Sequence, residues 1–201
     1  MEKVRKNRKR QLLLKVISAF LIVLSVILIS TKYINLYLKE KDNDIKVKEY
    51  IDNNMDSIKD DKELDTNNYA GVLEIPRINL KRGFLSKTDT NNNVNKNIEI
   101  LKDSDLPDTE NSNVILASHS GNSSVSFFKD LHLLENNDVI YLYYNRIKYE
   151  YVVINVEEVK KTGYIQINKD NTEKLLTLIT CKDDYSQIII TSKLNNISSY
   201  W

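Results

Sequence analysis

The chain has one cysteine, Cys181, and two histidines, His119 and His132, and a cysteine beside a histidine can act as an activated nucleophile. Cys181 ends the apolar run LLTLITC (175–181), and His119 follows the apolar run NVILAS (113–118). Each run is typical of a buried strand, so both residues are expected at strand ends, where catalytic groups are common. The alternative is that Cys181 is an inert core residue, as lone cysteines usually are. His132 lies among leucines and is expected to have no catalytic role.

Short strands are the main elements expected from residue 69 onward, because apolar and polar residues alternate there over short runs. A tight polar break at Asn145 is expected to join two of the strands. The expected strands are GVLEIP (71–76), RINLKRG (77–83), NVILAS (113–118), DVIYLYY (138–144), RIKYEYVVINVEEV (146–159), LLTLITC (175–181) and QIIITSKL (187–194). Many short strands with few helices predict a mainly β fold, a closed or nearly closed β-barrel.

One helix is expected within SSVSFFKDLHLLENND (123–138). Phe127 or Phe128 recurs with Leu131 and Leu134 at helical spacing, which predicts one apolar face. Ser123 or Ser124 is the expected N-cap, because a serine hydroxyl can accept from the free N–H groups of the first turn.

The N-terminal part of the chain is expected to be a membrane anchor. Residues 1–11 form a basic tail, and residues 12–31 are apolar enough and long enough for a helix to cross ~30 Å of hydrocarbon. The basic flank should stay in the cytoplasm, so the rest of the chain is expected outside. A cleaved signal peptide is the alternative, although no small-x-small cleavage site follows. Residues 32–66 are dense in charge and are expected to form a solvated stalk, partly helical, before a folded domain at 67–201.

The composition excludes some classes of protein. The formal net charge is +1, so no strong overall field favours a nucleic acid partner. A single cysteine cannot form an intramolecular disulfide, and stability must come from the core. The sequence contains no internal repeat and no glycine-rich phosphate loop, and no cofactor is expected.

Several stretches resemble the sortases, a family of cysteine transpeptidases. TLITC (177–181) resembles the sortase TLxTC strand, which ends on the nucleophilic cysteine, and ILASHSG (115–121) resembles the stretch around the catalytic histidine. FFKDLHLLENNDVIYL (127–142) is similar to the helix and strand that follow, with Asn137 in place of the usual glycine. Two further stretches, YAGVLEIPRINL (69–80) and LPDTENSNVILASH (106–119), resemble the opening strands and the lead-in to the histidine. The resemblance runs in order over residues 69–194 and implies a sortase-like closed β-barrel with one or two short helices.

The resemblance implies a reaction and its partners. Cys181 would attack the carbonyl of an LPxTG-like sorting signal at the C-terminus of a surface protein, and His119 would protonate the departing amine. A protonated histidine beside the sulfur would favour the reactive thiolate. An amine of a peptidoglycan precursor or of another acceptor would then take the acyl group. The enzyme would work at the outer face of the cell membrane.

The chain departs from the family at one functional position. Sortases have an arginine early in the last strand, whereas no arginine follows Cys181 here, and Gln187 stands at that position. Gln187 could donate a neutral hydrogen bond to the oxyanion, with a backbone N–H or the nearby Lys182 as the alternatives. Lys193 matches a non-catalytic family position. The loss of the arginine keeps two further functions open, a sortase-like binding module with weak or lost catalysis and a thiol hydrolase that releases the acyl group to water.

A substrate groove is expected over the strands that end at Cys181 and begin at Gln187. Its expected lining residues are Val114, Leu116, Ile179, Thr180 and Ile189.

Two loops bear on the class of sortase and on metal binding. The segment 160–174 is too short for the long helical insertion of class B sortases, and no C-terminal membrane span typical of pilin-polymerising sortases is seen, so a housekeeping or class D-like type is expected. The acidic stretch LKDSDLPDTE (101–110) is expected to be a solvated loop, although some sortases bind calcium with such loops. No metal is expected.

Overall fold

The computed structural model describes residues 2–56, 69–162 and 172–199, and the chain divides into two compact units, Met1–Asp42 and Asn43–Trp201. The elements are α1 (Glu2–Asp56), β1 (Gly71–Ile75), the 3₁₀ helix η1 (Pro76–Ile78), β2 (Leu80–Phe84), β3 (Glu99–Ile100), β4 (Asn113–Ala117), the 3₁₀ helix η2 (Leu131–Leu133), β5 (Val139–Tyr144), β6 (Ile147–Lys160), β7 (Leu175–Cys181) and β8 (Ser186–Ser199).

The first unit is the N-terminal part of α1, which carries the apolar run expected from the sequence. The segment Gln11–Asp52 contains a stretch long and apolar enough to cross a membrane, and apolar side chains from Leu12 to Ile29 are exposed. Serine hydroxyls within the run donate to carbonyls one turn earlier, Ser18 to Lys15 at 2.9 Å for example, so they do not remain unpaired. One long apolar helix of this kind is consistent with a membrane anchor.

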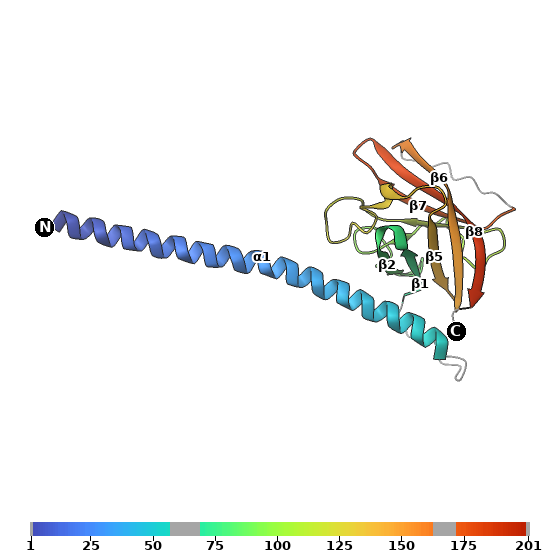
Figure 1. Cartoon of the computed structure of the whole chain (residues 1–201), viewed down its shortest axis with the longest axis horizontal. Coiled ribbons are helices and arrows are strands. Elements are labelled where there is room, and N and C mark those ends of the chain that lie inside the picture. The colour runs from blue at the N-terminus through green and yellow to red at the C-terminus, as the bar shows by residue number, and fades with distance from the viewer. Residues whose placement is uncertain (1, 57–68, 163–171, 200–201) are drawn as a thin grey trace. The chain divides into compact units, whose positions relative to one another are not determined.

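The strands of the second unit form one eight-stranded sheet that curls into a nearly closed barrel (Figure 1). The strand order is β2-β1-β5-β6-β8-β7-β4-β3, and among the described strands only β4 and β7 pair in parallel. The mainly β barrel predicted from the sequence is confirmed, and each of the seven expected strands is present. The expectations missed β3, because a strand of two residues has no periodic pattern to detect.

Alternating residues of β7 and β8 build one side of the core. Leu176 and Leu178 of β7, with Ile188 and Ile190 of β8, belong to the main apolar cluster. The antiparallel register pairs Leu178 with Ile190, so these side chains share one face of the sheet. The residues that alternate with them along the two strands, including Cys181 and Gln187, must therefore lie on the opposite face.

Two asparagines with a left-handed backbone conformation explain local features of the sequence. Asn145 has φ 47° and is followed by Arg146 at φ 64°, which together make the tight turn expected between β5 and β6. Asn137 has φ 77°, a conformation that favours glycine and that asparagine tolerates better than most residues. This accounts for an asparagine where the sortases usually have glycine.

The prediction of a helix with one regular apolar face at residues 123–138 is wrong. The stretch consists of turns and the 3₁₀ helix η2, and no side-chain hydrogen bond caps η2. Phe128, Leu131 and Leu134 are nonetheless buried in the core. Leu131 lies in η2 and Phe128 and Leu134 flank it, so all three are buried without a continuous helix.

The C-terminal part of α1 belongs to the barrel unit and packs on it. Val47 and Tyr50 are buried in a small cluster with Val72 and Tyr143, which lie on β1 and β5. The Tyr50 hydroxyl also donates to the Ala70 carbonyl at 3.0 Å.

Part of the stretch expected to form the stalk therefore packs on the barrel. Asn43, Val47 and Tyr50 lie four and three residues apart, so they share one helix face that covers the barrel. The expected boundary between stalk and domain at residue 66 lies outside the described residues.

A truncation tests the packing of this helix end. A fragment 43–201 should be more stable than a fragment 67–201, because only the longer one can bury Val47 and Tyr50. The difference should be about 3 kcal/mol, or roughly 10 °C in Tm, measured by circular dichroism. Equal Tm values for the two fragments would contradict the packing.

Candidate active site

The parallel pair β4 and β7 brings the histidine and the cysteine to the same edge of the sheet. Ala117 pairs with Ile179, and the pairing continues as the Ser118 N–H donates to the Ile179 carbonyl at 3.3 Å. His119 directly follows Ser118, and Cys181 directly follows Thr180. Because parallel neighbours run in the same direction about 4.8 Å apart, the register brings the segments that carry these two residues to the same edge of the sheet.

The side chain of Thr180 locks this junction. Its hydroxyl donates to the Ser118 carbonyl at 2.8 Å, within the buried part of the barrel. The bond joins the residue before Cys181 to the residue before His119. Thr180, expected to line the substrate groove, is 3% exposed and makes this contact with its hydroxyl.

His119 is half-buried and contacts an asparagine that sequence reasoning missed. Its Nε2 lies 3.1 Å from Oδ1 of Asn95, in the loop between β2 and β3. Its carbonyl accepts a hydrogen bond from the Phe128 N–H at 3.1 Å. His119 is therefore held by the hydrogen bond to its carbonyl and by the contact of its Nε2 with Asn95. Asn95 lies in an asparagine-rich loop, and nothing in its spacing distinguishes it.

Gln187 is the direct cross-strand partner of Cys181. Paired residues on antiparallel strands point to the same face, so the amide of Gln187 and the thiol share one face of the sheet. Cys181 is half-buried and Gln187 is 8% exposed. The position at which the resemblance implies an arginine is therefore adjacent to the cysteine in space.

A short hairpin fixes this register. The Asp183 carboxylate accepts from the Tyr185 and Ser186 N–H groups at 2.7 Å each, and the Lys182 N–H donates to the Ser186 carbonyl at 3.0 Å. The bond from the Tyr185 N–H is the chief reason that the pKa of Asp183 lies below its ordinary value. Asp183 is thus ionised at neutral pH and holds the turn closed.

Lys182, the other candidate oxyanion donor, is engaged on the other face. Its ammonium forms an ion pair with Glu158, which pairs in the sheet with Ile188 of the core face. The shared hydrogen bond raises the pKa of Lys182 and lowers that of Glu158. Val159, and not Glu158, lies opposite Gln187. Lys182 is therefore held away from the row that contains Cys181.

The expected groove lining divides between the two faces. Leu116 and Val114, expected to line the groove, are fully buried in the main core. Strand alternation could not assign the inward face before the register was known. Ile179 and Ile189 pair with each other and share the face of Cys181. They are 6% and 5% exposed but belong to neither core cluster, and they remain the candidate groove floor.

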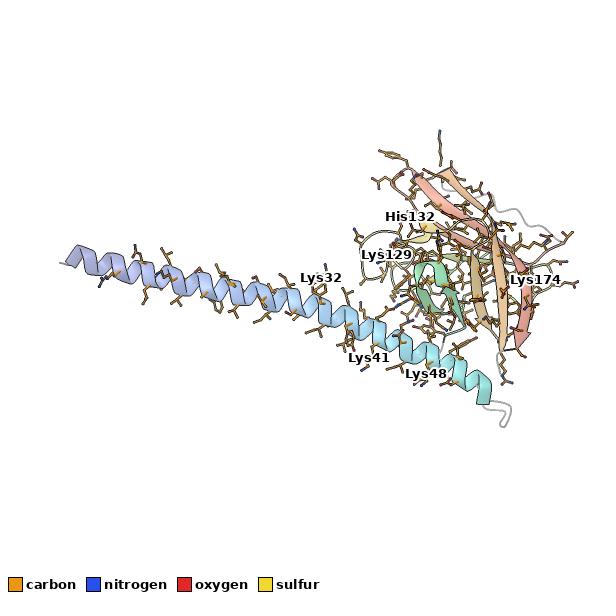
Figure 2. All side chains as sticks on the ribbon, in the orientation of Figure 1. Lys32, Lys41, Lys48, Lys129, His132 and Lys174 are labelled. Atoms are coloured by element: carbon orange, nitrogen blue, oxygen red, sulfur yellow. The ribbon has the colours of Figure 1, made fainter. Side chains whose placement is uncertain are left out.

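His132 behaves as expected for a surface residue. It is exposed in η2, and its Nδ1 lies 3.1 Å from the Lys129 carbonyl, with both residues labelled in Figure 2. It provides a natural control for His119.

The acidic loop 101–110 uses carboxylates for internal contacts. Asp105 accepts from the Asn113 N–H at 2.9 Å, and Asp108 accepts from the Asn145 amide at 3.0 Å. Within the described residues, no group of three or more histidine, cysteine, aspartate or glutamate residues is placed to hold a metal ion.

Comparison with known proteins gives one consistent family. The Sortase domain family matches residues 73–195. The chain is 25% identical to sortase A of Staphylococcus aureus over 186 residues, which is 87% of this chain and 88% of that protein. It is 30% identical to sortase A of Bacillus anthracis over 134 residues, 65% of this chain and 62% of that protein.

A solved structure supports the fold. The sortase D5 transpeptidase of Clostridium perfringens superimposes with a TM-score of 0.59 at 18% identity, covering 78% of this chain and 98% of that one. At this identity the likeness shows the fold alone. Because the family match spans more than half of the chain and includes both the His119 and the Cys181 stretches, the chain belongs to the sortase family of transpeptidases.

Proposed function

We propose that the protein is a membrane-anchored cysteine transpeptidase that cleaves an LPxTG-like sorting signal and transfers the surface protein to a cell-wall amine. The observation that supports this proposal is the parallel register of β4 and β7, whose last pair, Ala117 and Ile179, lies two residues before His119 and Cys181. The matched relatives include sortases of types A and D, in keeping with a housekeeping or class D-like enzyme. The segment 163–171, which bears on the class, lies outside the described residues.

The first half of the reaction forms a thioester. The Cys181 thiolate attacks the carbonyl carbon of the scissile peptide bond and gives a tetrahedral oxyanion. As this intermediate collapses, the carbon–nitrogen bond breaks and the leaving amine takes a proton from His119. The acyl part of the surface protein stays on the sulfur.

The second half forms a new amide. The amine of the acceptor attacks the thioester carbonyl and gives up a proton to His119, which is now neutral. The carbon–sulfur bond then breaks and Cys181 returns as thiolate. Water in place of the amine would yield the peptide acid, which is the hydrolase alternative.

Gln187 is the proposed donor to the oxyanion. It pairs with Cys181 across the strands, and its amide carries two N–H donors. A neutral donor stabilises an oxyanion less than a guanidinium does, so the enzyme should be slow. Ile179 and Ile189 form the proposed floor of the substrate groove beside it.

The nucleophile and the acid are tested by three variants of the full chain. Cys181→Ala should abolish cleavage of a labelled LPxTG-like peptide, because the chain has no other thiol. His119→Ala should lower kcat by about 10²-fold or more, since general acid–base catalysis contributes that much. His132→Ala is the matched control and should retain most activity. Equal losses from both histidines in folded proteins would contradict the assignment of His119.

The role of Gln187 has a distinct kinetic signature. Gln187→Ala should lower kcat by roughly 10-fold with little change in KM, because the bond to the oxyanion exists mainly in the transition state. Gln187→Arg should raise kcat if the pocket holds the longer side chain. Lys182→Ala is the control and should stay close to the parent. If Gln187→Ala matches the parent, the donor is a backbone N–H.

A sortase-like binding module is the second candidate, and the glutamine at the arginine position favours it. Incubation of the full chain with a labelled sorting peptide and an amine separates the functions. A transpeptide product supports the transpeptidase, and the peptide acid alone supports the hydrolase. Binding without turnover supports the module.

The proposed location is the cell membrane, with the N-terminus in the cytoplasm and the barrel outside. The basic tail of residues 1–11 and the apolar run of α1 support this orientation. Protease added to intact, wall-stripped cells should digest the barrel domain. Complete protection of Cys181 in that assay would show that the orientation is reversed.

A further inference from the structure

We propose that Asn43, on the part of α1 that packs on the barrel, is a positioning residue for His119. The proposal rests on the catalytic role proposed for His119. It follows from contacts that link residues 43–52 of α1, called here the helix end, to the loop that carries Asn95. All of these contacts lie within the unit Asn43–Trp201.

The link begins at the free edge of β2. This strand is the first in the sheet order and pairs only with β1 among the described strands, so its outer carbonyls have no partner strand. The Asn43 amide donates to the outer carbonyl of Lys81 at 3.1 Å. Asn43 is 1% exposed, so the donor side of this part-buried hydrogen bond is shielded from solvent.

The next outer carbonyl of the same edge, that of Gly83, contacts the loop that carries Asn95. Carbonyls two residues apart point the same way along a strand, so those of Lys81 and Gly83 lie on one edge. The Asn97 amide donates to the Gly83 carbonyl at 3.1 Å. The Asn97 side-chain oxygen accepts from Nε of Arg82 at 3.4 Å. Asn97 therefore fastens the loop to β2.

Tyr69 joins the two contacts. Its hydroxyl donates to Oδ1 of Asn43 at 3.3 Å. Its ring lies directly on Gly83, where an added Cβ would come within 1.9 Å of the ring. A displacement of Asn43 would therefore displace Gly83, both along the strand edge and through the Tyr69 ring.

The loop carries the contact to the active site. Asn95 lies two residues before Asn97 and meets Nε2 of His119 at 3.1 Å. The other side of the loop is held to β3, where Asn92 exchanges two hydrogen bonds with Ile100. With the β3 side fixed, loss of the β2 side would tilt the loop and shift Asn95. The helix end thus acts on His119 through Asn95 without touching substrate.

The test uses the full chain in detergent micelles, with histidine labelled at Cε1. Asn43→Ala should lower kcat roughly 3- to 10-fold and leave KM unchanged, because small misplacements of a catalytic group slow the chemical step. It should also move the Cε1–Hε1 resonance of His119 and leave that of His132 in place. If Asn43→Ala does not fold, Tyr69→Phe serves as the variant, because it deletes only the hydroxyl and keeps the ring on Gly83.

Tyr50→Phe is the matched control. It removes a different hydrogen bond of the same helix end, the one to the Ala70 carbonyl, and leaves both β2 contacts intact. It should lower Tm as much as Tyr69→Phe but leave kcat and both histidine resonances unchanged.

Two results would overturn the proposal. One is an equal loss of kcat in Asn43→Ala and Tyr50→Phe at equal Tm, and the other is a His119 resonance that Asn43→Ala does not move. The resonance decides the positioning role even if His119→Ala shows that the proposed function is wrong.

Discussion

The parallel pairing of β4 with β7 is the constraint on which the candidate site depends. Among the described strands this is the one parallel pair, and it brings the carboxyl ends of two strands to the same edge. A histidine and a cysteine that follow the last paired residues, Ala117 and Ile179, by two positions are thereby brought to that edge, although the bonded residues Ser118 and Thr180 are 62 positions apart in the chain. The Thr180 hydroxyl, bonded to the Ser118 carbonyl, holds this arrangement at its end.

The pleat of the sheet gives one face to the core and the other to the candidate site. On β7 and β8, one set of alternate side chains fills the core, and the other set carries Cys181, Gln187 and the isoleucines beside them. The tight hairpin closed by Asp183 keeps the two strands in register. A slip by one residue would send Cys181 into the core and Ile188 to the groove, so the packing of the core also fixes the chemistry.

Much of the fold could be predicted from the sequence, because the strands are short, alternating and bounded by turns. The cysteine and histidine at strand ends were visible for the same reason. The inward or outward direction of Leu116 and Val114 was not, since it depends on which strand pairs with which. The 3₁₀ turn at Leu131–Leu133 and the packing of Val47 and Tyr50 also depend on tertiary contacts. Asn95 has no local signal, because its contact with His119 joins two segments 24 positions apart in the chain.

The most direct test of the account is the mass of the intact protein during turnover. The full chain should be mixed with an LPxTG-like peptide without acceptor amine, quenched in acid and examined by mass spectrometry. The account predicts an added mass equal to the acyl fragment, located on Cys181 by peptide mapping and absent from Cys181→Ala. Cleaved peptide with no adduct at any time, or an adduct on another residue, would contradict a covalent mechanism at the edge where β4 and β7 meet.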